Sequence, residues 1–155
     1  MAPIKKRGEG RPMELLRATE TWQRAGAYYV RIQAMAKKHA ITLPREFDEH
    51  DTPETKYILA LDGDFPVGTA RIYELDADSM MIGRVVVLPE YRRQGLGSRI
   101  VAACEDWIRD LGCSVAVLES RDNKTAFYEG LGYGITGDAF IEGDTFRCIR
   151  MEKKL

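Results

Sequence analysis

The stretch Val85 to Ser98, V-V-V-L-P-E-Y-R-R-Q-G-L-G-S, decides the fold. Three β-branched residues in a row favour a buried strand, and Pro89 ends it because proline lacks an N–H and has a fixed φ. We therefore expect a strand over Met80–Leu88. Apolar residues then recur at intervals of three and four, which predicts an amphipathic helix over Gly95–Leu111 that ends at Gly112.

The loop between this strand and helix is suited to bind a phosphate or a diphosphate. The first turn of a helix has N–H groups without internal partners and carries about half a positive charge. Gly95 and Gly97 allow oxygen atoms to approach the backbone, and Arg92 and Arg93 add positive charge. Ile100 stands where G-x-G-x-x-G has its third glycine, and no G-x-x-x-x-G-K-[ST] occurs, which disfavours nucleoside triphosphates and dinucleotides.

The composition limits the number of domains, the cellular compartment and the classes of partner that we expect. A chain of 155 residues favours one domain, predicted over 13–155 after a glycine- and charge-rich segment 1–12 that is expected to be disordered. The three cysteines lack metal-ligand spacing, so we expect no metal and a reducing compartment. The sequence has neither a membrane-spanning apolar run nor a dense basic face, which predicts a cytoplasmic protein without nucleic-acid or membrane partners.

Periodicity predicts the remaining elements. The first half should contain a strand over 14–18, a helix over 21–39, a loop with a helical turn over 41–55, and a hairpin of 57–61 with 66–74. The predicted apolar face of the first helix comprises Trp22, Ala25, Tyr29, Ile32, Gln33 and Ala36. The second half should contain a strand over 114–119, a helix over 124–131, and a final hairpin of 133–136 with 146–152.

The order strand, helix, strand on the two sides of the glycine loop implies a parallel strand pair with a right-handed crossover. A ligand would then lie at the carboxyl ends of those two strands. Antiparallel strands before and after this pair complete an α/β domain.

A second motif, A-F-Y-E-G-L-G-Y over Ala126–Tyr133, follows the first at a separation known from one family. Together with Arg92, Gly95 and Gly97 in the pattern R-x-x-G-x-G, it resembles the GNAT superfamily of N-acetyltransferases. The resemblance implies the GNAT fold, a mixed and mostly antiparallel sheet with a central parallel strand pair flanked by helices. V-G-T-A-R and the acidic loop 46–51 look similar to the ElaA-like branch, whereas V-V-V and A-F-Y-E also look similar to glucosamine-phosphate acetyltransferases.

The resemblance implies acetyl-CoA as the co-substrate and assigns residues to it. The expected cofactor contacts are Val85, Val86 and Val87 for the pantetheine arm, Arg92, Arg93, Gln94, Gly95, Leu96, Gly97 and Ser98 for the pyrophosphate, and Asn123 and Phe127. Many members have an asparagine seven residues before the motif tyrosine; here Arg121 stands at that position and Asn123 lies two residues later.

The same resemblance makes Tyr128 the group that protonates the leaving thiolate. An unperturbed tyrosine, with a pKa of about 10, is protonated at neutral pH and can act as this donor. Glu119 and Glu74 end predicted strands and are candidates for the base that removes the proton of the amine, and a chain of water molecules is the alternative.

The expected function is acetyl transfer from acetyl-CoA to a primary amine of a small molecule. The alternatives are a protein or peptide N-acetyltransferase and a non-catalytic acyl-CoA-binding module. An amino-sugar phosphate is one possible acceptor and would need a basic pocket, for which Arg71, Arg84 and Arg147 are available. Members of the family are often dimers, so a homodimer is possible.

Overall fold

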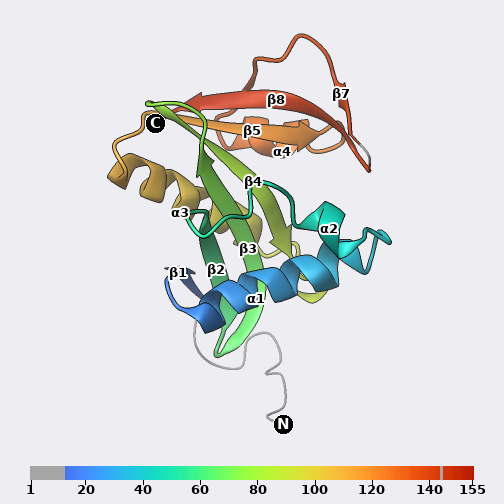
Figure 1. Ribbon diagram of the computed structural model, residues 1–155. Coiled ribbons are helices and arrows are strands. Elements are labelled where there is room, and N and C mark those ends of the chain that lie inside the picture. Colours follow the sequence, from blue (N-terminus) through green and yellow to red (C-terminus); the bar gives the residue numbers. More distant parts are fainter. Residues whose placement is uncertain (1–12, 144) are drawn as a thin grey trace. The chain divides into compact units, whose positions relative to one another are not determined.

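The computed structural model of the chain describes residues 13–143 and 145–155 (Figure 1). The segment 1–12, predicted to be disordered, lies outside the described residues. The elements in chain order are β1 (Glu14–Arg17), α1 (Thr21–Arg31), the π-helical turn η1 (Ile32–Ala36), α2 (Leu43–Glu46), β2 (Lys56–Asp62), β3 (Phe65–Glu74), β4 (Ser79–Val87), the 3₁₀ turn η2 (Pro89–Tyr91), α3 (Leu96–Asp110), β5 (Val115–Arg121), α4 (Thr125–Gly130), β6 (Gly134–Ile135), β7 (Ile141–Glu142) and β8 (Arg147–Lys154).

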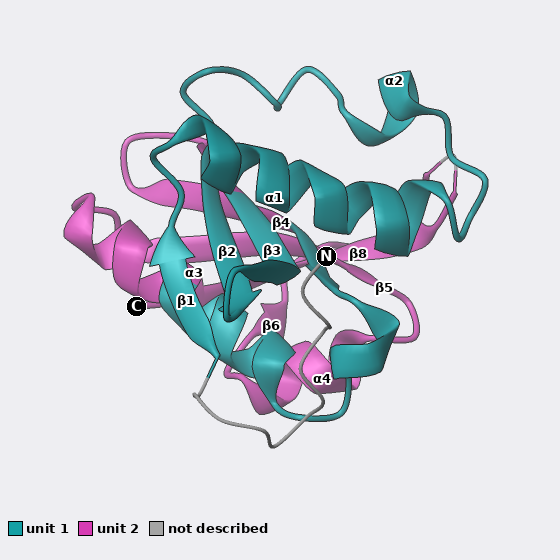
Figure 2. Cartoon of the chain, turned by 90° about the horizontal axis from the view of Figure 1, so that it is seen from below, with its two compact units in different colours: residues 1–71, 84–103 teal, residues 72–83, 104–155 magenta. Residues whose placement is uncertain are grey.

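The chain divides into two compact units (Figure 2). Unit 1 contains the residues up to Arg71 together with Arg84–Ala103, and unit 2 contains Ile72–Gly83 together with Cys104–Leu155. The prediction of a single domain over 13–155 stays a prediction.

Unit 1 is built on antiparallel pairing of β1 with β2, from Glu14 opposite Leu61 to Arg17 opposite Ile58. Helix α1 packs against β2, and in Figure 1 it runs across the direction of that strand. The predicted helix over 21–39 is present, but its last part widens into the π-helical turn η1.

The predicted apolar face of this helix is wrong within α1, although Ala36 of η1 is buried as predicted. The side chains buried from α1 are those of Gly26, Ala27, Val30 and Arg31, whereas Trp22 is 52% exposed. An arginine in the buried stripe shifts the apparent apolar face, because periodicity counts every charged residue as facing solvent.

Unit 2 contains the parallel pair that the sequence predicts. β4 pairs with β5 in parallel, from Ser79 opposite Val115 to Ile82 opposite Leu118. β8 pairs with β5 in antiparallel fashion on one side, from Cys148 opposite Arg121 to Lys154 opposite Val115.

The final hairpin is more divided than predicted. β6 pairs with the end of β8, Gly134 opposite Glu152, while an additional strand, β7, pairs with its beginning, Ile141 opposite Cys148. The two short strands therefore share β8 as their common partner.

The described strands follow the hydrogen-bonded order β1-β2-β3-β4-β5-β8-β6, with β7 also on β8. The expected mixed, mostly antiparallel sheet with one parallel pair and flanking helices is confirmed. Gly112 ends α3 with a φ of +85°, a conformation that glycine adopts without steric cost.

Gly68 in β3 should tolerate no larger side chain. A Cβ there would lie 2.7 Å from Cδ1 of Ile100, which is fully buried. We expect Gly68→Ala to lower the free energy of unfolding by about 1–3 kcal/mol in urea titrations. Gly134→Ala, where a Cβ has no atom within 4 Å, should change it by less than about 0.5 kcal/mol.

The clash with Ile100 can be tested separately. Ile100→Val removes Cδ1, so the double variant Gly68→Ala/Ile100→Val should lose less stability than the two single changes added together. Simple additivity would show that the cost at Gly68 has another origin.

Candidate active site

In unit 1, the loop between β4 and α3 is fixed at its start by a buried tyrosine. Tyr91, 6% exposed, donates a hydrogen bond from its hydroxyl to Asp62 Oδ2 at 2.8 Å. Burial, together with this carboxylate, raises the pKa of Tyr91 to about 12, so the hydroxyl stays a donor. Leu88 also donates its N–H to the carbonyl of Val67, which holds the end of β4 on β3.

The glycine-bearing part of the loop turns sharply and leaves backbone donors open. Arg93 and Gly95 both have left-handed φ angles, +61° and +77°, and no atom lies within 4 Å of where a Cβ on Gly95 would be. Arg99 donates its N–H to the carbonyl of Gly95, which starts the helical ladder. The N–H groups of 96–98 precede the first complete turn and have no acceptor within the helix.

Arg92 and Arg93 are exposed beside these donors, and Gln94 is half-buried. Arg92 donates from Nε to the carbonyl of Val87 at 3.1 Å, which ties the loop to the strand before it. The predicted pyrophosphate residues are thus brought together in unit 1, with open N–H groups and two guanidinium groups that suit a diphosphate.

Near its end β4 changes from buried to accessible. Its first four residues are buried, whereas Gly83, Arg84, Val85 and Val87 are half-buried. Arg84 interrupts the extended backbone with a φ of +48°. Val85 to Val87, the residues expected at the pantetheine arm, follow directly after this interruption.

Unit 1 also contains a cluster of buried ions that the sequence analysis did not find, here called the ionic cluster: Arg31, Arg71, Arg84, Glu46, Asp48 and Asp51. Arg31 is completely buried and donates to Glu46 Oε1 at 3.1 Å and to Asp51 Oδ1 at 2.6 Å. Arg71 donates to both oxygens of Asp48, at 2.8 and 3.0 Å. The acidic loop after α2 was visible in the sequence, but its arginine partners were not.

In unit 2, Tyr128 lies on α4 with its ring half-buried. Its ring packs edge-on against those of Phe127 and Tyr133, with centroid separations of 4.9 and 6.1 Å. Burial raises the pKa of Tyr128 to about 12, although the nearby Arg121 opposes this rise. The hydroxyl is therefore a phenol throughout the physiological pH range, as a proton donor requires.

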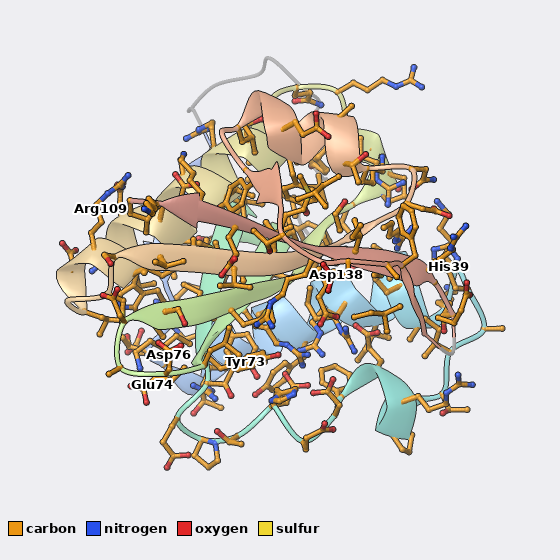
Figure 3. All side chains as sticks on the ribbon, turned by 90° about the horizontal axis from the view of Figure 1, so that it is seen from above. His39, Tyr73, Glu74, Asp76, Arg109 and Asp138 are labelled. Atoms are coloured by element: carbon orange, nitrogen blue, oxygen red, sulfur yellow. The ribbon has the colours of Figure 1, made fainter. Side chains whose placement is uncertain are left out.

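The other candidates of unit 2 differ in position. Glu119 and Asn123 are exposed and lie towards and beyond the carboxyl end of β5, and Phe127 is 39% exposed. Glu74 lies at the opposite end of the parallel pair, at the turn where Ser79 begins β4, and Figure 3 shows it beside Asp76. Glu119 is four residues beyond Val115, about 13 Å along β5, so it lies well away from the strand end near Glu74.

The comparisons with known proteins agree with this arrangement. The family model described as acetyltransferase (GNAT) family matches residues 13–133. The chain belongs to the GNAT family of acetyltransferases. A Bacillus subtilis protein named as an acetyltransferase is 32% identical over 117 residues, 74% of this chain and 79% of the relative. The predicted enzyme class, an acetyl-CoA-dependent N-acetyltransferase, is confirmed by this membership.

Solved structures of GNAT proteins show the same fold. A Lactobacillus plantarum structure titled as an N-acetyltransferase matches with a TM-score of 0.87 and 27% identity, over 94% of this chain and 99% of that one. Escherichia coli ElaA matches with a TM-score of 0.78 and 19% identity, over 92% and 100%. A GNAT acetyltransferase of Elizabethkingia anophelis with acetyl-CoA bound matches with a TM-score of 0.68 and 17% identity, over 92% and 98%.

The likeness to ElaA is thus one of fold, and the similarity to glucosamine-phosphate acetyltransferases stays a prediction. None of the described helices combines the length and apolar character needed to cross a membrane. Residues 13–143 and 145–155 contain no group of three or more His, Cys, Asp or Glu side chains placed to hold a metal.

The ionic cluster should make the free energy of unfolding depend on pH in the acid range. Burial alone would raise the pKa of Asp51, but hydrogen bonds from Arg31 and Tyr57 outweigh it and hold this pKa well below the usual range. The resulting stabilisation is complete above the unfolded pKa of about 3.9 and is lost as the pH falls further. Asp51→Asn should therefore cost about 3–5 kcal/mol at pH 7, because Arg31 loses a charged partner.

Urea unfolding of the wild type and Asp51→Asn at pH 7, 4 and 3 tests this. The difference in the free energy of unfolding between the two proteins should become smaller below pH 4. Asp106→Asn serves as the control, because its exposed pair with Arg109 is worth less than about 1 kcal/mol. A constant difference across the pH range would contradict the assignment.

Proposed function

We propose that this chain transfers the acetyl group of acetyl-CoA directly to a primary amine of a small molecule. The observation that carries the proposal is the strand end, loop and helix start of unit 1, in which the N–H groups of 96–98 have no acceptor within the helix and follow the exposed Arg92 and Arg93. A diphosphate fits this loop, because Gly95 leaves the backbone unobstructed. The acetyl-CoA bound to a GNAT protein of the same fold supports this choice of co-substrate.

The proposed cofactor contacts are those of the sequence analysis. Backbone groups of Val85 to Val87 would bind the pantetheine arm, and Arg92 to Ser98 would bind the pyrophosphate. The carbonyl of Val87 already accepts from Arg92, so we assign the N–H of Val87 to the thioester oxygen, where negative charge develops. Asn123 and Phe127 are proposed as further cofactor contacts on the resemblance of their segment to the family motif.

Acetyl transfer forms one C–N bond and breaks one C–S bond. The neutral amine attacks the thioester carbonyl, the sulfur leaves with the bonding electrons, and the new ammonium group loses a proton. Tyr128 donates to the leaving sulfur. A phenol with a pKa of about 12 is weaker as an acid than a thiol of about 8.5, so complete transfer alone would be uphill by roughly 5 kcal/mol.

We therefore propose that Tyr128 donates a hydrogen bond to the sulfur and passes its proton to it as the ammonium group formed in the attack replaces that proton. Glu119, exposed on β5, is the proposed base that takes the earlier proton, the one that the substrate ammonium loses before the attack, and water is the alternative. A protein or peptide acceptor, a non-catalytic acyl-CoA-binding role, a homodimer and a cytoplasmic location remain alternatives or predictions to be tested.

Acetyl-CoA should stabilise the protein, and Gly95 should be needed for this. At a hundred times its dissociation constant, acetyl-CoA would add about 2.7 kcal/mol, a rise of several degrees in Tm, whereas ATP and NAD should add little. Gly95→Ala places a Cβ at φ +77° in the phosphate loop and should reduce the rise.

Gly63→Ala is the matched control, because Gly63 also has a left-handed φ, +63°, and open space around it, but lies in the turn after β2. Both variants should lose about 1 kcal/mol of stability, and only Gly95→Ala should respond less to acetyl-CoA. Equal rises with acetyl-CoA and ATP would refute the proposed cofactor.

Tyr128→Phe should separate the enzyme from the binding module. It removes the hydroxyl and keeps the ring between Phe127 and Tyr133. We expect kcat for thiol release in the presence of an amine to fall by about 10²- to 10⁴-fold, with the Tm rise from acetyl-CoA retained. Unchanged turnover would remove Tyr128 from the mechanism, and a wild type that binds acetyl-CoA without any turnover would favour the binding module.

A further inference from the structure

Arg84 has a backbone conformation that an arginine rarely adopts. Its φ of +48° lies in the left-handed region, where a Cβ is unfavourable and glycine is the usual residue. Such residues persist where the surrounding structure holds them, and they gather at ligand-binding sites. An arginine at this position therefore calls for a role of its side chain.

The contacts of Arg84 within the ionic cluster are weaker than those of the other two arginines. Its Nη2 lies 3.3 Å from the carbonyl of Glu46 and 3.3 Å from Asp48 Oδ2, and its Nε lies 3.4 Å from Glu46 Oε1. That Nε is buried and has no hydrogen-bond partner among the described residues. The cluster thus holds Arg84 through long contacts.

The carboxylates beside Arg84 are already held more closely by other cations. Glu46 accepts from Arg31 at 3.1 Å, and Asp48 accepts from Arg71 at 2.8 and 3.0 Å. Three carboxylates and three guanidinium groups balance formally, but the guanidinium–carboxylate contacts of 3.1 Å or less within the cluster come from Arg31 and Arg71. Burial and the neighbouring Arg71 lower the pKa of Arg84, so its charge is poorly compensated.

Among the arginines of the cluster, Arg84 alone is within reach of a ligand. Its side chain is 29% exposed, whereas Arg31 is completely buried and Arg71 is 4% exposed. Arg147, the third arginine considered for a basic pocket, lies in unit 2 and pairs with Glu142 at 3.2 Å. Because Arg71 is almost completely buried, it is excluded as a direct anion contact.

Arg84 also lies next to the strand residues that are proposed to bind the cofactor. It directly precedes Val85 to Val87, and a strand advances about 3.3 Å per residue, so its Cα is within roughly 10 Å of Val87, the residue proposed to receive the thioester oxygen. The guanidinium group of Arg84 is therefore a candidate contact for a second functional group of an amine acceptor held at that oxygen.

We propose that Arg84 binds an anionic group, a carboxylate or a phosphate, carried by the acceptor amine. This inference rests on the proposed function and narrows its substrate class to amines with a nearby negative charge. A guanidinium group suits both anions, because its paired N–H groups match two of their oxygens.

The test compares two pairs of amines in the thiol-release assay. 2-Aminoethyl phosphate is paired with 2-aminoethanol, and 3-aminopropanoate with its amide, so that the two pairs distinguish phosphate from carboxylate. The wild type should prefer the anionic member of at least one pair by about tenfold or more in kcat/KM. Arg84→Gln should lower kcat/KM for that amine by roughly 10- to 100-fold, mainly through KM, and change its neutral partner by less than about threefold.

Two further variants make the result specific. Arg84→Gly removes the guanidinium group and also suits the left-handed φ, so it should show the same selective loss without a backbone penalty. Arg109→Gln is the matched surface control, because Arg109 is 46% exposed, pairs with Asp106 on α3, and extends from the helix in Figure 3. It should leave both amines unaffected.

A preference for the neutral amines, or equal losses for both members of a pair in Arg84→Gln, would overturn the proposal. If no amine is acetylated, the proposed function fails, and binding decides the inference separately. With CoA present, 2-aminoethyl phosphate or 3-aminopropanoate should then raise the Tm of the wild type more than its neutral partner does, and this difference should vanish in Arg84→Gln. Equal shifts for both members of each pair would overturn the anion site as well.

Discussion

The charge of Arg31, completely buried in α1, is the constraint on which unit 1 depends. A guanidinium group without water must have anionic partners, and Glu46 and Asp51 supply them. These partners hold the loop after α2 against the helix. The hydroxyl of Tyr57 donates to Asp51 as well, which joins the loop to β2. The requirement of one buried cation thus orders a segment that has little regular structure of its own.

The ionic cluster and the glycine-bearing loop 92–98 present different kinds of groups. The loop presents backbone N–H groups, which bind oxygen atoms whatever the neighbouring side chains are. The cluster presents side chains, and its members differ in how completely they are satisfied. Arg31 and Arg71 are buried and contact carboxylates at 3.1 Å or less, whereas Arg84 makes longer contacts and is partly exposed. In the arrangement that we propose, the co-substrate would be bound mainly by backbone groups and the acceptor would be selected by individual side chains.

The sequence predicted the elements whose signals are local. Pro89 and Gly112 mark the strand end and the helix end, and the β-branched run before Pro89 marks a strand, so the unit around the glycine loop needed no tertiary information. The face of α1 could not be predicted, because Arg31 is buried through partners 15 and 20 residues away. β7 was not predicted, because a strand of two residues is too short to show an alternating hydrophobic pattern.

The candidate site also has features that motifs predicted and features that only the structure reveals. The roles of Tyr128 and the loop came from motifs, and the structure adds the burial and pKa of the tyrosine. The ionic cluster joins α1, the acidic loop, β3 and β4 through side-chain bonds between segments up to 38 residues apart, which no local pattern encodes. The position of Glu74 also required the strand register, since the end of a strand can face either end of a parallel pair.

The pairing of β1 with β2 has a consequence for the order of folding. Glu14 meets Leu61, so this ladder closes a loop that contains α1, η1, α2 and the whole acidic loop. A helix can form within its own segment, but long-range strand pairing must first overcome the entropy of loop closure. Arg31 lies inside the closed loop and can lose its water only when the acidic loop arrives. We therefore expect the ion pairs to form late in folding and to slow unfolding more than they speed folding.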